Sequence, residues 1–110
     1  MSSAYVPEAG DIVWLKFDPQ AGHEQAGRRP AVVLSPAGYN ARAGMIVCCP
    51  TTTRIKGYPF EVALAGKPAS VVLADQVKSQ DWRELRATRM VHVAPAELAE
   101  VRAKLVALIG

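Results

Sequence analysis

Residues 11–17 read DIVWLKF, a stretch with the composition of a β-strand. Gly10 supplies a turn just before it, and β-branched and aromatic side chains suit a pleated surface. Side chains on a strand alternate between two faces. One face would carry Ile12, Trp14 and Lys16, and the other Val13, Leu15 and Phe17. The stretch therefore predicts a strand that begins a β-rich fold.

Several later stretches have the same β character, and turn-forming residues rather than helices separate the early ones. The predicted strands are 31–35 (AVVLS), 45–49 (MIVCC), 60–64 (FEVAL), 71–74 (VVLA) and 88–93 (TRMVHV). Residues 65–70 (AGKPAS) have hairpin composition, and residues 39–42 predict a short turn or half-helix. Residues 79–85 (SQDWREL) predict one or two helical turns capped by Ser79.

The C-terminus carries the clearest helical pattern of the chain. Pro95 suits the first helical position, where no backbone N–H is needed. An apolar stripe follows at steps of three and four residues, formed by Leu98, Val101, Leu105 and Leu108. Short strands followed by one terminal helix predict a mainly β fold, a small and partly closed barrel with the helix packed on it.

Length and composition restrict the class of protein. The chain has 110 residues, half of them hydrophobic, and a net charge of +3, which fits one globular domain over residues 1–110. The mild basicity is compatible with a polyanionic partner. The adjacent Cys48 and Cys49 would point to opposite faces of a strand, so we expect reduced packing residues rather than a disulfide. We expect no metal and no cofactor, because the histidines and cysteines lack metal-ligand spacing.

The location of the protein is predicted from what the sequence does not contain. Its apolar runs are too short to span a membrane. Its N-terminus, MSSAYVPEAGD, lacks a basic start followed by an apolar segment, so no signal peptide is visible. We therefore expect a cytoplasmic protein without membrane contact.

Polar segments between the strands are the candidates for chemistry. The common nucleotide-binding, metalloprotease and serine-hydrolase motifs do not occur. Cleavage of RNA by its own 2′-hydroxyl would need phosphate-binding donors and a proton acceptor. Arg29 offers a fork of donors to phosphate, Thr52 a hydroxyl, and Glu24 a carboxylate that can accept a proton. From the residues alone, these signals indicate a small basic barrel that binds nucleic acid or phosphate.

Several stretches together resemble the MazF/PemK family of toxin endoribonucleases. They include YVPEAGDIVW (5–14), FDPQAGHEQAGRRPAVVLSP (17–36), the hydroxyl loop 50–56, KGYPFEV (56–62), LADQVKS (73–79) and VAPAELAEVRAKLVALIG (93–110). The resemblance implies an SH3-like barrel of the CcdB/MazF/PemK type, with a C-terminal helix, that forms a homodimer. It also implies sequence-specific, metal-independent cleavage of single-stranded RNA, chiefly messenger RNA, which leaves 2′,3′-cyclic phosphate and 5′-OH ends.

The same resemblance implies residue roles and a protein partner. The family's catalytic arginine and threonine match Arg29 and Thr52, and its loop glutamate matches Glu24. RNA binding is expected along a groove at the dimer interface, where a cognate MazE-like antitoxin would insert its acidic C-terminal tail. The residues expected to bind RNA are Trp14, Phe17, Gln25, Arg28, Thr53, Lys56, Tyr58, Asp75, Gln76 and Lys78.

Two points stay open on the sequence alone. The first is whether Glu24 or Arg29 is the general base. An arginine is a poor base because its pKa is above about 12. Arg29 is therefore assigned mainly to stabilising phosphate charge, and Arg28 to electrostatic steering of the RNA. The alternative functions are a gyrase-inhibiting toxin of the CcdB type without RNase activity, and an inactive module that only binds RNA or an antitoxin.

Overall fold

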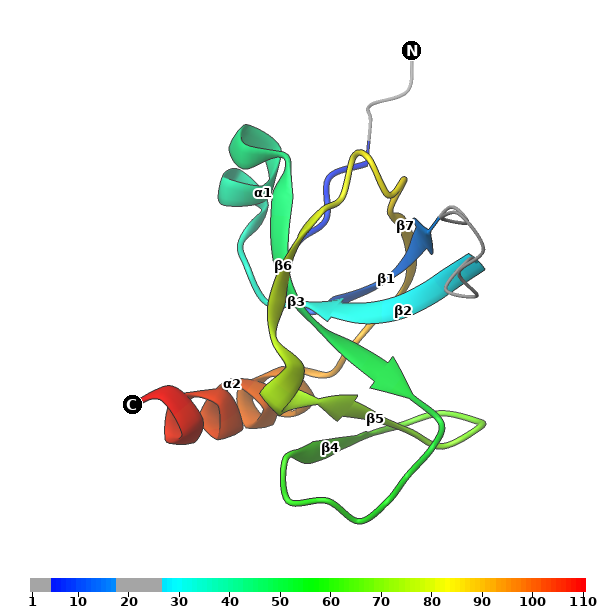
Figure 1. The fold of residues 1–110 in the computed structure, drawn as a ribbon, viewed down its shortest axis with the longest axis vertical. Helices are drawn as coiled ribbons and strands as arrows, with labels where there is room; N and C mark the ends of the chain where they lie inside the picture. The colour runs from blue at the N-terminus through cyan, green and yellow to red at the C-terminus, as the bar shows by residue number, and fades with distance from the viewer. Residues whose placement is uncertain (1–4, 18–26) are drawn as a thin grey trace.

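The computed structural model describes residues 5–17 and 27–110. These residues form seven strands, two α-helices and one 3₁₀ turn, shown in Figure 1. In chain order the elements are β1 (Asp11–Phe17), β2 (Gly27–Val33), α1 (Ala37–Ala43), β3 (Met45–Thr52), β4 (Glu61–Leu64), β5 (Ser70–Leu73), η1 (Ala74–Gln76), β6 (Lys78–Asp81), β7 (Thr88–His92) and α2 (Pro95–Ile109). No helix among them is long and apolar enough to cross a membrane.

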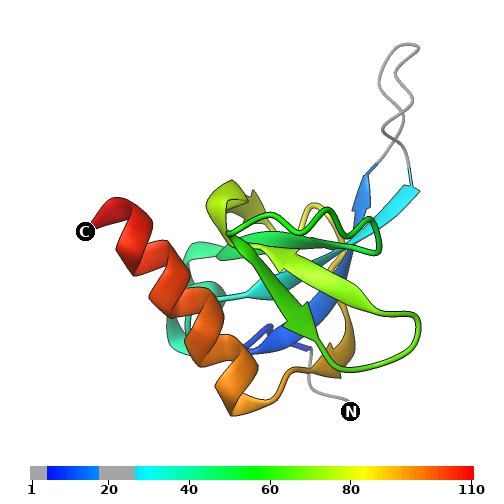
Figure 2. The ribbon, with the colours of Figure 1, turned by 90° about the horizontal axis from the view of Figure 1, so that it is seen from below.

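The strands form one curled antiparallel sheet. Their order is β4-β5-β3-β2-β1-β7, and β6 pairs with β3 off this path. The long strand β3 joins the two parts of the sheet, because residues 45–48 pair with β6, residues 48–50 with β2 and residues 51–52 with β5. The sheet curls into a half-barrel, and α2 packs against β4 and η1 at one end of it (Figures 1 and 2). The predicted mainly β fold with a C-terminal helix is confirmed.

Both faces of the central strands are buried, in two separate hydrophobic clusters. One cluster contains Val32, Cys49 and Val72 and contacts α2 through Val101, while the other contains Val33, Cys48 and residues around Trp82. Cys48 and Cys49 therefore lie on opposite faces of β3, and both are free thiols, as the sequence predicts. Burial raises the pKa of Cys48 to about 12 and that of Cys49 to about 11, so both thiols are uncharged at neutral pH.

Helix α2 is held to the half-barrel by its apolar stripe and by polar contacts at both ends of β4. Val101 is 1% exposed, and Leu98 and Leu105 pack against the same cluster. The carboxylate of Glu97 accepts a hydrogen bond from the Ala65 amide at 2.7 Å. The Lys104 ammonium donates to the carbonyls of Pro59 and Glu61, at 2.8 and 2.9 Å. These contacts fix the helix against β4 and the loop before it.

The structure differs from the sequence-based prediction in two places that affect the site. Residues 78–81 form strand β6, paired with residues 45–48 of β3, so the helical prediction for 79–85 is wrong. Pairing to a neighbouring strand here outweighs the local helical preference. Strand β2 begins at Gly27 rather than at Ala31, because Arg28 and Arg29 pair with Lys16 and Leu15 of β1. The two arginines therefore stand on a paired strand, not in a loop.

Candidate functional site

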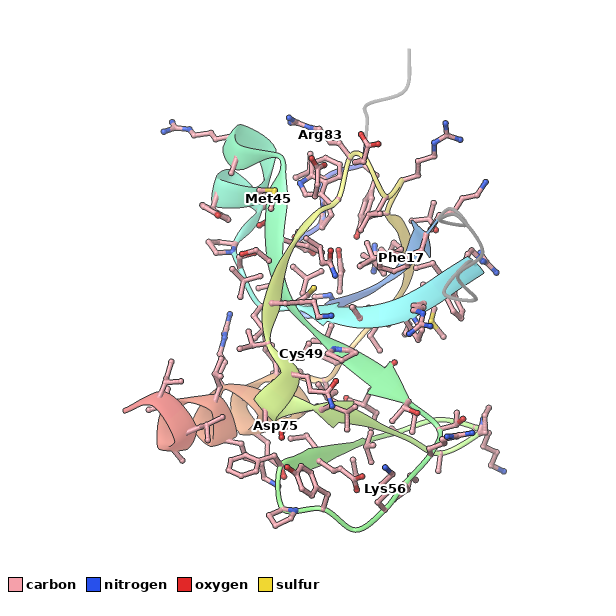
Figure 3. The ribbon with its side chains drawn as sticks, in the orientation of Figure 1. Phe17, Met45, Cys49, Lys56, Asp75 and Arg83 are labelled. Carbon is pink, nitrogen blue, oxygen red and sulfur yellow. The ribbon has the colours of Figure 1, made fainter. Side chains whose placement is uncertain are left out.

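A basic pocket of about 120 Å³ opens between side chains of four neighbouring strands, β1, β2, β3 and β6. We call it the Arg29 pocket; its walls are Leu15, Phe17, Arg29, Pro30, Ala31, Cys48, Pro50, Gln76, Lys78 and Gln80. Most of these residues come in pairs two positions apart on β1, β2, β3 and β6, as the alternation of strand side chains requires. Figure 3 shows Phe17 at the end of β1, beside β2. The floor is apolar, whereas Arg29 and Lys78 bring two cations to the rim.

A second pocket of about 390 Å³ lies on the other side of Pro30, which lines both. We call it the Thr52 pocket. Its walls come from the hydroxyl run at the end of β3, from the β4–β5 hairpin and from β7, and include Trp14, Thr51, Thr52, Thr53, Leu64, Lys67, Met90 and Val91. It is more apolar than the Arg29 pocket, and hydroxyl groups form one of its edges.

Arg29 and Thr52 stand at the ends of two paired strands, on opposite sides of Pro30. The β2–β3 ladder ends with Ala31 opposite Pro50. Arg29 and Thr52 each lie two residues beyond this last pair, Arg29 on β2 and Thr52 on β3. The structure thus brings the two predicted catalytic residues to adjoining pockets rather than into a single one. A phosphate between them can meet a guanidinium on one side and a hydroxyl on the other.

The hydroxyl of Thr52 is oriented by its own loop. Its oxygen accepts a hydrogen bond from the backbone N–H of Arg54, at 3.0 Å. This bond uses one lone pair of the oxygen and leaves the hydroxyl hydrogen to donate. The turn therefore presents Thr52 as a hydrogen-bond donor at the edge of its pocket.

Arg28 is placed differently from Arg29. Its guanidinium carbon lies 4.6 Å from the centre of the Trp14 ring, a cation–π distance. Trp14 also lines the Thr52 pocket. Arg28 therefore adds positive charge near the Thr52 pocket, while Arg29 lines the Arg29 pocket.

The loop between β3 and β4 carries two further predicted RNA-binding residues, Lys56 and Tyr58, outside both pockets. The carboxylate of Glu61 accepts the backbone N–H groups of Lys56 and Gly57, each at 3.0 Å. The Tyr58 hydroxyl donates to Asp75 at 2.8 Å, which raises the pKa of Tyr58. Figure 3 shows Lys56 in this loop and Asp75 at the turn between β5 and β6. These hydrogen bonds hold the loop to β4 and to η1, and they leave the Lys56 side chain exposed.

The predicted site residues fall into four groups. Phe17, Arg29, Gln76 and Lys78 line the Arg29 pocket, and Trp14, Thr52 and Thr53 line the Thr52 pocket. Arg28 stacks on Trp14, while Lys56, Tyr58 and Asp75 belong to the neighbouring loops. Glu24 and Gln25 lie outside the described residues. Sequence analysis missed Gln80, because the helical prediction for its segment hid the alternation that puts it beside Lys78 on one face of β6.

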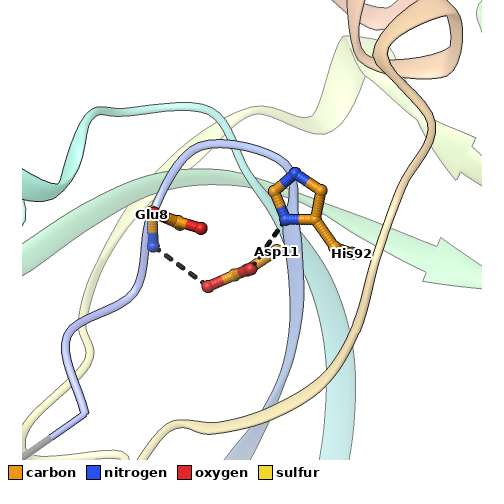
Figure 4. Close-up of side chains that lie close together, drawn as sticks. All are labelled: Glu8, Asp11 and His92. Atoms are coloured by element: carbon orange, nitrogen blue, oxygen red, sulfur yellow. Dashed lines mark hydrogen bonds and ion pairs between the residues drawn. The ribbon is translucent and has the colours of Figure 1, made fainter.

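A cluster of charged groups lies away from both pockets, where the N-terminal segment meets β7. Glu8, Asp11 and His92 each have a side-chain oxygen or nitrogen of the kind that binds metal ions, and these atoms lie within 4.8 Å of one another (Figure 4). The Asp11 carboxylate, 1% exposed, already accepts hydrogen bonds from the Tyr5 hydroxyl at 2.5 Å, the Glu8 amide at 3.1 Å and His92 at 2.9 Å. Arg89 lies 3.6 Å from the same carboxylate. The cluster therefore acts as a clamp between chain segments, and protein donors occupy the oxygens of the Asp11 carboxylate.

The protonation of Asp11 links this clamp to stability. Burial opposes ionisation of the carboxyl, but the hydrogen bonds from His92, Tyr5 and Glu8 and the charge of Arg89 together outweigh it and lower the pKa of Asp11. Because the pKa of Asp11 is lower in the folded protein than in the unfolded chain, its ionised carboxylate stabilises the fold at pH values above about 3.9, the pKa in the unfolded chain. That stabilisation is lost as the pH falls through the folded value.

We expect Asp11→Asn to lower the free energy of unfolding at pH 7 by about 2–3 kcal/mol, because charged acceptors form the stronger hydrogen bonds. Urea unfolding of both proteins between pH 7 and pH 3 measures the difference. It should be constant from pH 7 to about pH 5 and shrink below about pH 4, where the wild-type carboxylate becomes protonated. A difference that grows toward low pH would contradict this assignment.

Comparison with known proteins places the chain in a family. A sequence model of the PemK-like, MazF-like toxins of type II toxin–antitoxin systems matches residues 8–109. The chain is 57% identical over 111 residues to the endoribonuclease toxin MazF of Escherichia coli K12, with 100% of both chains covered. It is 36% identical to the endoribonuclease toxin ChpB of the same organism, with 93% of each chain covered.

Solved structures agree with the sequence comparison. MazF in a MazE–MazF crystal structure from Deinococcus radiodurans superposes with a TM-score of 0.91 at 56% identity, covering 97% of this chain and 98% of that one. MazF crystallised from the same organism superposes with a TM-score of 0.85. The fold, the matched residues and the level of identity agree, and the chain belongs to the PemK-like, MazF-like toxins of type II toxin–antitoxin systems.

Proposed function

We propose that residues 1–110 form one toxin domain that cleaves single-stranded RNA at short sequence motifs and thereby stops translation and growth. The relatives named endoribonucleases support the RNase activity. The observation that carries the proposal is the placement of Arg29 and Thr52 in two adjoining pockets that share Pro30 as a wall. Sequence-specific cleavage needs such a phosphate-binding centre beside room for bases.

The reaction we propose is attack by the 2′-hydroxyl on the adjacent phosphate. The 2′-oxygen forms the new bond to phosphorus as the bond to the 5′-oxygen breaks, which leaves a 2′,3′-cyclic phosphate and a 5′-OH. Arg29 stabilises the charge that builds on the phosphate, because its forked donors match phosphate oxygens. Thr52 donates its hydroxyl hydrogen to the same phosphate. Glu24, as the loop carboxylate, is our candidate for the base that takes the 2′-OH proton, and water donates a proton to the 5′-oxygen as it leaves.

The chain's own residues supply the phosphate-binding donors and the base of this scheme, so we propose a metal-independent reaction. Cleavage in the presence of a metal chelator tests this proposal. Purified protein should cut single-stranded RNA in EDTA at a rate within about twofold of the rate in magnesium. Loss of cleavage in EDTA that returns with a divalent cation would contradict metal independence. Inhibition of DNA gyrase without any RNA cleavage would instead support the CcdB-type alternative.

We also propose a homodimer whose shared groove binds RNA or, alternatively, the acidic C-terminal tail of a MazE-like antitoxin. The MazE–MazF structures of the D. radiodurans relative support an antitoxin partner. The positive charge that Arg28, Arg29 and Lys78 bring to this side of the barrel suits both polyanionic ligands. Light scattering of the purified chain should give twice the monomer mass, and an active monomer would contradict the dimer.

Thr52→Ala tests the role of the hydroxyl. We expect the turnover number to fall about 10- to 100-fold, while affinity for an RNA made uncleavable by 2′-deoxy sugars changes less than about threefold. The reason is that the hydroxyl is assigned to charge that develops only as the phosphate reacts. Thr53→Ala is the control: Thr53 lines the same pocket but is assigned to binding, so its loss should lower RNA affinity while most of the turnover remains. A loss of affinity with unchanged turnover would refute the assignment.

A further inference from the structure

Gln80 is the residue of the Arg29 pocket that neither the sequence motifs nor the proposed cleavage chemistry uses. It stands on β6, opposite Ile46 of β3, and two residues after Lys78, which lies opposite Cys48. Lys78 and Gln80 therefore share one face of the strand, and both line the pocket. Their neighbour Ser79 points to the other face and does not line it. The register thus fixes the position of Gln80 relative to the phosphate-binding residues.

The pocket combines the groups that a nucleotide needs. Its floor is apolar, its rim holds two cations for phosphate, and Phe17 offers an aromatic face on which a base can stack. What remains for recognition is the edge of the base, which only a hydrogen-bonding side chain can read. Two amides, Gln76 and Gln80, line the pocket and are able to do this.

Gln80 is better placed than Gln76 to distinguish one base from another. Gln76 ends the 3₁₀ turn and is exposed, whereas Gln80 is half-buried on a paired strand, which fixes its backbone and restricts its rotamers. Its side chain enters none of the side-chain hydrogen bonds found among the described residues, so its donor and its acceptor are both available.

We propose that Gln80 determines the sequence preference of the cleavage reaction, by pairing with a base that presents an exocyclic amine beside a ring nitrogen. A primary amide matches that pattern with two parallel hydrogen bonds, as in its known pairing with adenine; cytosine presents the same pattern. The inference rests on the proposed RNase function and adds to it the residue that reads the base. Phe17 stacks on the base, and Arg29 and Lys78 hold the adjoining phosphate.

The experiment compares the wild type with Gln80→Met on a pool of RNAs with randomised bases, with the ends of the products sequenced. Methionine has nearly the same length and flexibility but cannot pair with a base edge. The wild type should show one position beside the cut with a strong preference for adenine or cytosine. In Gln80→Met that preference should fall about tenfold, while cuts at the other bases persist. Ser79→Ala, on the opposite face of β6, is the matched control and should keep the wild-type preference.

A second measurement separates base reading from a structural role. In the preferred RNA, the selected base is replaced by its analogue without the exocyclic amine. This replacement should slow cleavage by the wild type about tenfold. Cleavage by Gln80→Met should not change, because this variant has no amide that could pair with the amine. Circular dichroism melting checks that the variant folds. If it does not, Gln80→Asn replaces it, because its amide lies one methylene further from the base and should lose the same preference.

The outcomes distinguish the two levels of the proposal. An unchanged base preference in folded Gln80→Met, or an equal penalty for the missing amine in both proteins, would overturn the role of Gln80 and leave the RNase function standing. A uniform loss of cleavage at every site would also overturn it, because a residue that reads one base does not control the others. A wild type that cuts no RNA at all would overturn the proposed function itself.

Discussion

Replacing Arg29 by alanine should abolish RNA cleavage, with a loss of at least about 10³-fold in turnover number. Arg29 is the guanidinium of the pocket beside Thr52, and no other arginine of the described residues lines that pocket. Its loss removes the donors that meet the phosphate as charge builds up in the transition state. Single-turnover cleavage of a fluorescent RNA measures the effect.

The matched control is its neighbour on β2. Arg28→Ala should reduce RNA affinity modestly and make binding less sensitive to salt, because Arg28 lies on Trp14 and adds charge at a distance. Both side chains are exposed, so neither substitution should change the melting temperature by more than a few degrees. Arg29→Lys adds a further test, since an ammonium keeps the charge but loses the fork. Near-normal turnover in Arg29→Ala would refute its placement at the reacting phosphate.

Asn40→Ala should be the most destabilising of these substitutions, with a loss of about 3 kcal/mol or more in the free energy of unfolding. Asn40 is fully buried at the centre of α1. Its amide donates to the carbonyls of Pro7 and Ser35, at 2.8 and 3.0 Å, and its side-chain oxygen accepts from the Ser35 hydroxyl at 2.6 Å. Alanine leaves these buried groups without partners and adds a cavity.

Urea unfolding measures this loss, and α1 supplies a control. Tyr39 precedes Asn40 in the same helix but is 46% exposed, so Tyr39→Ala should change the free energy of unfolding by less than about 0.5–1 kcal/mol. Helix propensity alone would favour alanine at both positions. A small effect of Asn40→Ala, similar to that of Tyr39→Ala, would show that the buried hydrogen bonds do not hold α1 to the N-terminal segment.

Much of the fold follows from local patterns, and the exceptions have physical reasons. Alternation predicts β1 and the opposite-facing Cys48 and Cys49, and the apolar stripe with Pro95 predicts α2. Local patterns fail for β6, where pairing with β3 decides the conformation. They also miss Asn40 and Asp11 as buried polar centres, because their partners lie up to 81 residues away in the chain.

The sequence predicts which residues belong to the candidate site but not how they are arranged in space. The resemblance named Arg29, Thr52 and five further residues that line the two pockets. It could not place Arg29 and Thr52 in adjoining pockets separated by Pro30, because this depends on the β2–β3 register. Nor could it find Gln80, whose place follows from the alternation of a strand that the sequence predicts as helical turns.

The central claim is that the RNA's own 2′-hydroxyl attacks the phosphate held between Arg29 and Thr52. The most direct test is an RNA with a single 2′-deoxy sugar on the 5′ side of the preferred cleavage point, incubated with the protein in EDTA. We expect no cleavage at that position, unchanged binding, and 2′,3′-cyclic phosphate and 5′-OH ends on the unmodified RNA. Cleavage of the 2′-deoxy RNA at the same position, or 5′-phosphate ends, would contradict the account.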